Sequence, residues 1–237
     1  MSADKKELPS HILAFKDTEF LAREELRGIR MQLELLKTNL ALSEQGIHQT
    51  IVIFGSARIA NPDNQYYRQA QKLSARITAH YLNAPQQCII ATGGGGGIME
   101  AVNRGAAEAG GKSVGFNISL PHEQTPNTYI TPELCFQFEH FSMRKMQFFM
   151  RTKALIVFPG GFGTLDELFE ALTLIQTEKM PRIPVILFDK AYWNKIINFD
   201  ALLEAGMIAA KDLSFIHYAK TSEEAWAILK QSMLENN

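Results

Sequence analysis

Apolar and polar positions follow two alternating patterns from residue 50 to the end of the chain. Short, continuous apolar runs typical of buried strands alternate with longer segments in which apolar residues recur every three or four positions, as in amphipathic helices. This alternation predicts an α/β fold built on a Rossmann-like, doubly wound parallel sheet. The predicted strands are residues 50–54, 88–91, 113–118, 134–138, 154–158, 184–188 and 214–219.

A separate helical pattern precedes the first predicted strand. Residues 17–42 carry one apolar stripe, and their opposite face is charged, which is typical of a helix. We therefore expect an N-terminal helical extension, residues 1–48, followed by one domain, residues 49–237. The stripe has two interpretations of equal weight: it packs on its own subunit, or it helps to bury a subunit interface. Its members are Ala22, Leu26, Ile29, Leu33, Leu36 and Leu40.

The most informative stretch is residues 154–168, which read as a buried strand, a glycine turn and the start of a helix. A strand that leads through Gly160, Gly161 and Gly163 into a helix forms an anion site, because free N–H groups and the positive end of the helix dipole point at the ligand. Thr164 and Glu167 also have the spacing of a capping box, in which the glutamate has no chemical role. A second such box, Thr221 with Glu224, has no glycines before it.

Two more glycine turns follow predicted strands. Gly55 and Ser56 follow the first strand, with Arg58 nearby as a cation, and five consecutive glycines, residues 93–97, follow the second. Five glycines cost much backbone entropy, so close approach of a ligand to the backbone explains them better than a plain turn does.

The same turns exclude two common nucleotide motifs. A P-loop is absent, and Ile98 stands where a dinucleotide fingerprint needs glycine. The acidic residue that such a fingerprint requires further on is missing as well. Three phosphate-compatible turns at one edge of a parallel sheet therefore indicate a compact nucleotide or sugar phosphate.

Residues 140–150 add basic side chains to this picture. With Ser142 as the N-cap, Arg144 and Lys145 fall in the first turn of a helix, where cations oppose the dipole and indicate an anionic partner. The apolar residues of this helix are interpreted as core or interface packing. The polar loop of residues 121–132 is placed to cover a site.

Composition narrows the classes of ligand and partner that the protein can have. A net charge of −1 gives no basic field for nucleic acid or an anionic membrane, and no apolar run approaches transmembrane length. The polar N-terminus and the two cysteines, Cys88 and Cys135, interpreted as buried reduced thiols, indicate a cytoplasmic protein. The six histidines show no metal-ligand spacing, so we expect no metal and no cofactor.

Several motifs resemble those of the LOG ("lonely guy") family. The segment Pro159-Gly-Gly-Phe-Gly-Thr-Leu-Asp-Glu167 is similar to the P-G-G-x-G-T-x-x-E motif of that family, and Met143-Arg-Lys145 is similar to its R-K motif. The glycine turns at residues 54–58 and 93–101 match as well. The resemblance covers roughly residues 50–220, and the first 45 or so residues depart from the shortest members.

This resemblance implies a nucleotide-binding catalytic domain that works as a homodimer or larger homo-oligomer, with the site near the subunit contact. The implied activity is that of a phosphoribohydrolase, which cleaves AMP or N6-substituted AMP to the free base and ribose 5-phosphate. Arg144 and Glu167 are implied as the catalytic pair. The residues expected to contact the substrate are Gly55, Ser56, Gly94, Gly95, Gly96, Glu100, Met143, Lys145, Gly160, Gly161, Gly163 and Thr164.

Other functions are weighed against this one. Members of the family are often labelled lysine decarboxylases, but no lysine here has an S-x-H-K context for a pyridoxal-phosphate Schiff base. A nucleotide or cofactor carrier of the same fold that does not hydrolyse its ligand is the main alternative. A broader nucleoside monophosphate nucleosidase is the third, because nothing in the sequence fixes the base.

Overall fold

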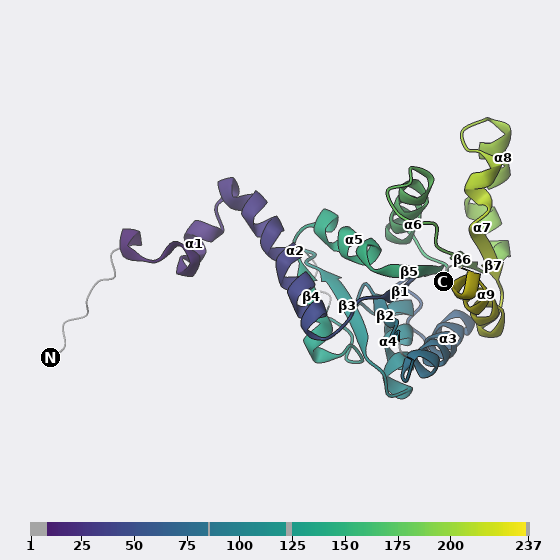
Figure 1. Cartoon of the computed structure of the whole chain (residues 1–237), viewed down its shortest axis with the longest axis horizontal. Coiled ribbons are helices and arrows are strands. Elements are labelled where there is room, and N and C mark those ends of the chain that lie inside the picture. Colours follow the sequence, from purple (N-terminus) through teal and green to yellow (C-terminus); the bar gives the residue numbers. More distant parts are fainter. Residues whose placement is uncertain (1–8, 85, 122–124, 236–237) are drawn as a thin grey trace.

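A seven-stranded parallel sheet forms the centre of the computed structural model, which describes residues 9–84, 86–121 and 125–235 (Figure 1). The strand order is β4-β3-β2-β1-β5-β6-β7, and every neighbouring pair runs parallel. The prediction of a doubly wound α/β sheet is confirmed. The strands are β1 Thr50–Phe54, β2 Ile89–Thr92, β3 Ser113–Ile118, β4 Cys135–Phe138, β5 Thr152–Val157, β6 Val185–Phe188 and β7 Ile216–Ala219.

Helices cover both faces of this sheet. One face packs against α3, α4 and α9, and the other against α2, α5, α6, α7 and α8. Short 3₁₀ turns occur at residues 9–11, 14–16, 24–26, 132–134 and 210–213. The helices are α1 Thr18–Leu21, α2 Arg27–Glu44, α3 Gln65–Tyr81, α4 Ile98–Glu108, α5 Phe141–Met150, α6 Phe162–Gln176, α7 Lys190–Ile196, α8 Phe199–Glu204 and α9 Ser222–Glu235.

The two layers of helices explain why the strands are apolar throughout. In β1, Ile51 and Ile53 enter the core on one side of the sheet, whereas Val52 and Phe54 enter the core on the other. All four side chains are at most 2% exposed. A strand buried on both faces needs an unbroken apolar run, which is the pattern that the sequence shows.

The topological switch point lies between β1 and β5, which pair along their whole length up to Phe54 and Val157. The chain leaves β1 for α3 on one face and leaves β5 for α6 on the other. In such sheets the diverging connections open a crevice at the carboxyl ends of the strands. The glycine turns after β1, β2 and β5 all lie at this edge.

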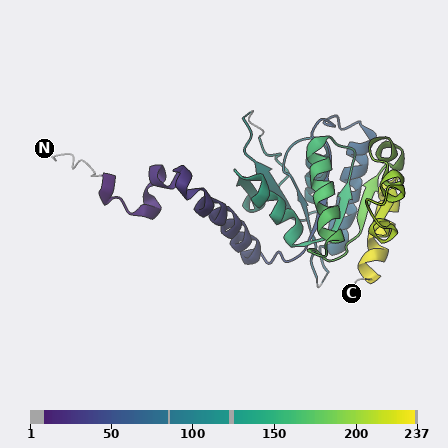
Figure 2. The same cartoon turned by 90° about the horizontal axis from the view of Figure 1, so that it is seen from above.

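The predicted helix over residues 17–42 is interrupted. It begins as α1, breaks after Leu21 and resumes as α2, with Arg23 in an extended conformation. The Arg30 Nη1 donates to the carbonyls of Leu21 and Arg23 at 3.0 and 2.7 Å and so satisfies groups that the break leaves free. This N-terminal segment leads away from the body of the molecule, as Figure 2 shows.

Two further expectations were wrong. The helix predicted over residues 191–204 is divided into α7 and α8, because the Asn198 side chain accepts a hydrogen bond from Ala201 N and starts a new helix. Cys135, predicted to be buried, is exposed on the edge strand β4, where alternate residues face outward. Within the described ranges, none of the helices combines the length and apolar character needed to cross a bilayer.

Thr221 caps the start of α9 as the sequence predicts, whereas the glutamate of the predicted capping box binds the residue before the cap. Thr221 Oγ1 accepts a hydrogen bond from Glu224 N at 3.2 Å, and the Glu224 carboxylate accepts one from Lys220 N at 2.7 Å. The helix packs on α3 and on the sheet, so its first turn is part of the fold rather than a free end.

Replacing Thr221 by alanine should therefore destabilise the protein by about 1 kcal/mol, because Glu224 N loses its acceptor. For a chain of this size, that loss of stability should lower Tm by about 2–4 °C. Thr173→Ala is the matched control, since this exposed threonine lies inside α6 and caps nothing. Equal Tm values for the two variants would show that the cap adds no stability.

Candidate active site

Backbone hydrogen bonds join the three glycine turns at the carboxyl edge of the sheet. Ser56 N donates to the carbonyl of Pro159 at 3.1 Å, and Ser56 O accepts from Ile98 N at 3.1 Å. The turn after β1 therefore connects the turn after β5 with the start of α4. These contacts bring segments more than a hundred residues apart into one rigid edge.

Arg144 reaches this edge from α5. Its Nε donates to the carbonyl of Phe116 in β3 at 2.8 Å, and its guanidinium lies 5.3 Å from the centre of the Phe148 ring. The other end of the guanidinium is so close to the five-glycine loop that a Cβ on Gly93 would meet Nη2 at 2.6 Å. The arginine is thus fixed between a strand end, an aromatic ring and the loop, with its side chain 11% exposed.

Glu167 faces Arg144 from α6. The distance from Glu167 Oε1 to Arg144 Nη2 is 3.6 Å, and the glutamate side chain is 12% exposed. This separation is longer than the about 2.7–2.9 Å of a charge-assisted hydrogen bond. Both groups therefore keep hydrogen-bonding capacity that a ligand between them can use.

The capping interpretation of Glu167 is wrong. Helix α6 begins at Phe162, with Gly161 at the N-cap and no side-chain cap, so Thr164 lies inside the first turn. Glu167 is then in the second turn, where no free backbone N–H is within its reach. At the identical spacing of Thr221 and Glu224 the threonine does cap its helix, which shows that the position of the helix start decides whether this sequence pattern forms a cap.

The Arg144–Glu167 pair has unusual protonation behaviour because it is removed from water. Burial raises the pKa of Glu167 to about 7, although the positive charge of Arg144 opposes this rise. Burial also lowers the pKa of Arg144, and the charges of Glu167 and Asp166 oppose that change. A carboxyl group that titrates near neutral pH can accept or release a proton during a reaction.

A network of buried and half-buried polar side chains holds the five-glycine loop. The Asn127 side chain donates to the carbonyls of Gly94 and Gly95 at 3.1 and 2.9 Å and also contacts Asn103 Oδ1. Thr92 Oγ1 bonds to Asn103 as well and accepts from Gly94 N. This network fixes the loop before any ligand arrives.

The Asn127 contacts also tie part of the predicted covering loop, residues 121–132, to the glycine loop; residues 122–124 lie outside the described ranges. The sequence analysis did not single out Asn127, since an asparagine in a polar loop carries no local signal. Position 94 requires glycine because φ is +74° and a Cβ there would clash with the Asn117 side chain.

The turn before α6 presents free backbone donors. The N–H groups of Phe162, Gly163 and Thr164 precede the first intrahelical bond, and no side chain caps them. Added Cβ atoms on Gly161 or Gly163 would meet nothing within 4 Å. The turn is held from behind, because Tyr192 Oη donates to the carbonyl of Gly160 at 2.6 Å.

Some predicted contact residues have other roles in the described structure. Gly55 packs against Ile98, whose side chain a Cβ would meet at 2.6 Å. Gly160 packs against Thr164 in the same way, and Met143 packs on the apolar core.

Two charged residues of the predicted set already have partners. Glu100 accepts a hydrogen bond from Tyr67 Oη at 3.0 Å, and a Cβ on neighbouring Gly96 would lie 4.0 Å from its carboxylate. Lys145 pairs with Asp166 and Glu170 on α6, at 3.2 and 2.7 Å.

The start of α5 differs from its prediction. The helix begins at Phe141 with His140 as N-cap, so Ser142 is not the cap. The two cations for which an anionic partner was expected, Arg144 and Lys145, face carboxylates of α6. The start of α5 is bound by a different carboxylate, that of Glu34 in α2, which accepts from the backbone N–H groups of Glu139 and His140 at 3.0 and 3.4 Å. Glu34, Glu139 and His140 are also close enough to share a metal ion, but these hydrogen bonds already explain where Glu34 lies.

The fold and the site together define a class: Rossmann-like α/β proteins whose strand ends carry glycine turns and uncapped helix starts suited to an anionic ligand. Residues 99–229, more than half of the chain, match a protein family described as "Possible lysine decarboxylase". The chain belongs to this family, the LOG family.

Curated relatives in plants are distant. "Probable cytokinin riboside 5'-monophosphate phosphoribohydrolase LOGL3" of Oryza sativa subsp. japonica is 25% identical over 189 residues, which are 76% of this chain and 82% of that protein. "Cytokinin riboside 5'-monophosphate phosphoribohydrolase LOG4" of Arabidopsis thaliana is 28% identical over 135 residues, 56% of this chain and 61% of that protein. The match thus spans about three fifths of the Arabidopsis protein.

Solved structures share the fold. The X-ray structure of the structural-genomics target TM1055 has a TM-score of 0.57 and 24% identity, covering 77% of this chain and 99% of that one. The molybdenum cofactor binding protein from Rippkaea orientalis has a TM-score of 0.53 and 21% identity, covering 78% and 95%. At these identities the similarity establishes the fold alone.

The contact between Gly93 and Arg144 yields a prediction. Gly93→Ala should displace the guanidinium, because Nε is held by Phe116 O and the Cβ would meet Nη2 at 2.6 Å. A shift of about 1 Å in a catalytic group can cost about a hundredfold in rate, so a catalytic role for Arg144 predicts that turnover falls at least tenfold in Gly93→Ala.

Gly161→Ala is the informative comparison, because its Cβ meets nothing within 4 Å in the free protein. It should leave Tm unchanged and weaken only the affinity for a phosphate-containing ligand, measured by calorimetry. Unchanged turnover in Gly93→Ala would show that the Arg144 position does not matter.

Proposed function

We propose that the protein is a phosphoribohydrolase that cleaves the N-glycosidic bond of purine nucleoside 5'-monophosphates, AMP or N6-substituted AMP. The observation that carries the proposal is the buried Arg144–Glu167 pair, 3.6 Å apart, beside Gly93 at the edge where three glycine turns meet. The cytokinin riboside 5'-monophosphate phosphoribohydrolase activity named for plant relatives supports it.

The reaction divides the substrate into two products. Water adds to C1' of the ribose while the bond from C1' to the purine nitrogen breaks, giving ribose 5-phosphate and the free base, which takes up the proton. The sugar carries positive charge in the transition state, as in glycoside hydrolysis generally. A carboxylate held in a site of low dielectric stabilises that charge without reorganising. We assign this role to Glu167, which can also orient the attacking water.

Arg144 and the α6 turn bind the anionic parts of the substrate in this proposal. The free N–H groups at residues 162–164 offer donors for the phosphate, with the helix dipole behind them. Arg144 either offsets negative charge on the departing purine or contacts the phosphate. Arg144 and the α6 turn both lie at the edge of the sheet where the backbone of Ser56 binds Pro159 and Ile98.

Lysine decarboxylation, the activity in the family description, does not suit this site. A lysine that forms a Schiff base must lose its proton. Burial lowers the pKa of Lys145, but its hydrogen bonds to Glu170 and Asp166 outweigh that effect, and the net pKa is raised. Lys145 therefore stays charged and paired with carboxylates of α6.

A carrier function is the second candidate. The fold similarity to a molybdenum cofactor binding protein favours it, since both chains align over most of their length. Nucleotide that binds in calorimetry and is recovered whole after long incubation would identify a carrier. The base preference of a hydrolase is a separate question, and a broader nucleoside monophosphate nucleosidase would release several bases.

We also propose a homo-oligomer with the site near a subunit contact, in the cytoplasm. Phe141 and Met150 lie on α5, the helix that carries Arg144, and each is 51% exposed. Large apolar side chains that are exposed on one helix suit contact with a protein partner. Both cysteines are free, in keeping with a reducing compartment.

The test is Glu167→Gln, assayed with AMP for adenine and ribose 5-phosphate by chromatography. The wild type should release both products. The rate of the variant should be about 10²–10⁴-fold lower, because glutamine cannot carry the stabilising charge. Glu170→Gln is the matched control: it lies one turn along the same helix and pairs with Lys145 rather than Arg144. A folded Glu167→Gln protein with full activity would exclude the catalytic role.

The raised pKa of Glu167 predicts a pH dependence. Only the ionised carboxylate stabilises positive charge, so kcat/KM for AMP should fall about tenfold per pH unit below about 7. The substrate phosphate also titrates, near pH 6. The pH profile of the residual activity of Glu167→Gln distinguishes the titration of Glu167 from that of the phosphate. In this variant the decrease in kcat/KM near pH 7 should be absent, and any decrease near pH 6 should remain. A wild-type profile with no limb near 7 would contradict this assignment.

A further inference from the structure

A strained residue, Asp189, lies at the same edge of the sheet as the candidate active site. It follows β6 with φ +72° and ψ +86°, in the left-handed region that residues with a Cβ seldom adopt. In the described ranges the other such residue, Glu178, ends α6, where a left-handed backbone is common. Asp189 has no helix before it, and backbone strain persists only where the surrounding contacts maintain it.

A helix cap alone does not explain the conformation of Asp189. Its Oδ1 accepts hydrogen bonds from the backbone N–H groups of Ala191 and Tyr192 at 3.0 and 3.4 Å, so it caps the short helix α7. A capping residue usually has an extended backbone. Asn64, which caps α3, has φ −64° and ψ 136°. Capping therefore does not require the left-handed backbone at position 189.

A third donor holds the same carboxylate from another helix. Tyr66 Oη of α3 donates to Asp189 Oδ2 at 2.5 Å. Burial and the hydrogen bond to Asp189 raise the pKa of Tyr66 to about 12, so the hydroxyl keeps its proton. The hydrogen bond from Tyr66 lowers the pKa of Asp189, although burial opposes this change, so the carboxylate stays ionised. Asp189 therefore joins the first turns of α3 and α7.

Tyr192 extends this link to the turn before α6. Its backbone N–H is bound by Asp189, and its Oη donates to the carbonyl of Gly160 at 2.6 Å. The preceding carbonyl, that of Pro159, accepts from Ser56 N at 3.1 Å. Two successive peptide groups of the turn are thus held by fixed partners. Because a trans peptide directs its N–H opposite to its C=O, the N–H of Gly161 points away from Tyr192.

Helix α7 is anchored without the hydroxyl of Tyr192. The next residue, Trp193, is fully buried, and its ring contacts the Tyr192 ring edge-on, with 5.2 Å between the ring centres. A phenylalanine at position 192 would keep this ring contact and lose only the hydrogen bond to Gly160. The hydroxyl therefore acts on the turn before α6 rather than on the helix that carries it.

We propose that Asp189 and Tyr192 are positioning residues for the phosphate group of the ligand. Asp189 orients the start of α7, and the Tyr192 hydroxyl then holds the Gly160 peptide, so that the N–H groups from Gly161 onward converge on one anion. This role rests on the proposed function only in that the ligand carries a phosphate. Neither side chain needs to touch the ligand. Loss of the link weakens ground state and transition state alike, which raises KM and leaves kcat unchanged.

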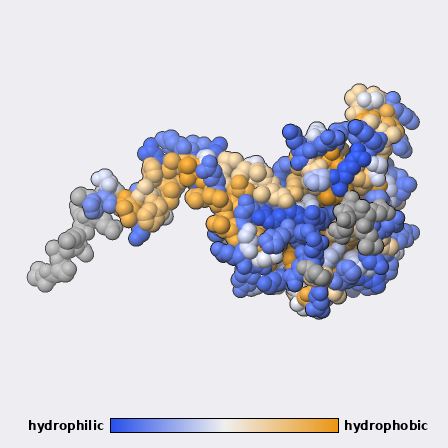
Figure 3. Space-filling model, viewed as in Figure 1, coloured by the Kyte–Doolittle hydropathy of each residue, from blue (hydrophilic) through white to orange (hydrophobic). Residues whose placement is uncertain are grey.

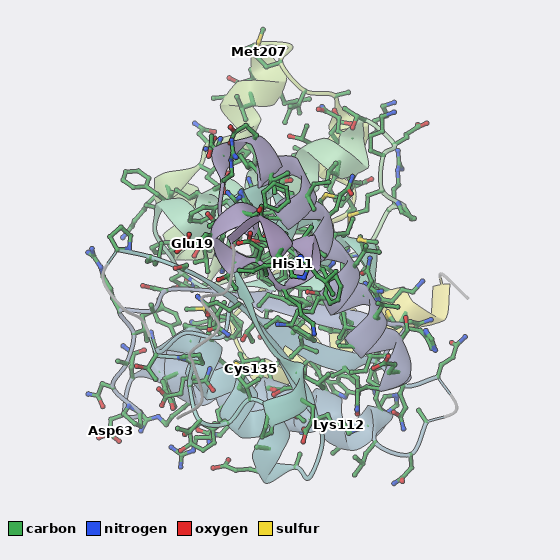
Figure 4. All side chains as sticks on the ribbon, turned by 90° about the vertical axis from the view of Figure 1, so that its left-hand side faces the viewer. His11, Glu19, Asp63, Lys112, Cys135 and Met207 are labelled. Carbon is green, nitrogen blue, oxygen red and sulfur yellow. The ribbon has the colours of Figure 1, made fainter. Side chains whose placement is uncertain are left out.

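The test uses the full chain and measures the affinity for ribose 5-phosphate by calorimetry, together with KM and kcat for AMP. Tyr192→Phe should weaken ribose 5-phosphate binding and raise KM by about threefold to tenfold, the range expected for one lost hydrogen bond, with kcat within about twofold of the wild type. Tyr81→Phe is the matched control and should change none of these values. Tyr81 and Lys112 line one cavity at the opposite edge of the sheet. Figure 4 shows Lys112 on the other side of the molecule from Asp63, which lies between β1 and α3.

Two variants at position 189 separate the carboxylate from the backbone. Asp189→Gly adopts the left-handed backbone freely but removes the acceptor, so its ribose 5-phosphate affinity should fall at least as far as that of Tyr192→Phe. Asp189→Asn tolerates the same φ and keeps an acceptor oxygen for Ala191 N and Tyr192 N. Its affinity should stay within about twofold of the wild type. A lower Tm in Asp189→Gly with unchanged ribose 5-phosphate affinity would show a role in stability alone and refute the proposal.

Assembly should be the same in all these variants. Figure 3 shows apolar surface along the N-terminal segment and α2, at the end of the molecule opposite α7 in the view of Figure 1. Light scattering should therefore give one mass for the wild type and every variant, so a change in affinity comes from the turn and not from altered association.

The outcomes distinguish this role from the proposed function. Turnover of AMP with an unchanged KM in Tyr192→Phe would overturn the positioning role and leave the phosphoribohydrolase standing. Ribose 5-phosphate binding that depends on Tyr192, in a wild type that releases no adenine, would support the positioning role and refute hydrolysis. A wild type that binds no ribose 5-phosphate would overturn the positioning role as well, because the turn would then hold no phosphate.

Discussion

A buried guanidinium is the constraint around which the site is arranged. Moving an isolated charge out of water costs several kcal/mol, so a charge 11% exposed needs partners on every side. Arg144 has the Phe116 carbonyl, the Phe148 ring and the Glu167 carboxylate. Phe148 lies on the same helix as Arg144, whereas Phe116 and Glu167 come from β3 and α6, so the geometry of this one side chain requires that α5 sit against both of these elements.

The same constraint explains why glycine is needed beside the arginine. The guanidinium occupies the space that a Cβ on Gly93 would take, and Gly94 adopts a conformation that side chains rarely allow. These two glycines therefore serve the protein's own packing. Gly161 and Gly163 differ, because nothing of the described protein lies where their side chains would be. The two groups separate glycines that shape the site from glycines that leave room for a ligand.

The strands and the glycine turns that follow them could be predicted from local sequence patterns. Apolar runs located the strands because both faces of a parallel sheet are buried, and the glycine turns predicted at strand ends do meet at one edge of the sheet. The sequence could not tell which of two identical capping patterns forms a cap. Before Thr164, long-range contacts hold the turn: Ser56 N donates to Pro159 O, and Tyr192 Oη donates to Gly160 O. The helix then starts at Phe162, which places Thr164 inside its first turn.

Contacts between distant segments account for the rest of what sequence analysis missed. Asn127 and Tyr192 act through the carbonyls of glycines more than thirty residues away, and no spacing rule reveals such bonds. The interruption of the helix after Leu21 involves a nearer side chain, Arg30, which donates to the carbonyls of Leu21 and Arg23. Polar side chains that satisfy a backbone group far along the chain leave no periodic signal.

Helix α2 connects the exposed N-terminal surface with the site. On its outer side it carries the apolar stripe, and on its inner side Glu34 and Asn39 hold the beginning and the end of α5. Helix α5 in turn carries Arg144 at a position where Phe116 and Gly93 tolerate little movement. A partner seated on α2 would restrict the helix that orients α5. Assembly and the geometry of the buried pair would then be coupled through hydrogen bonds from Gln147 and Arg151 to Asn39.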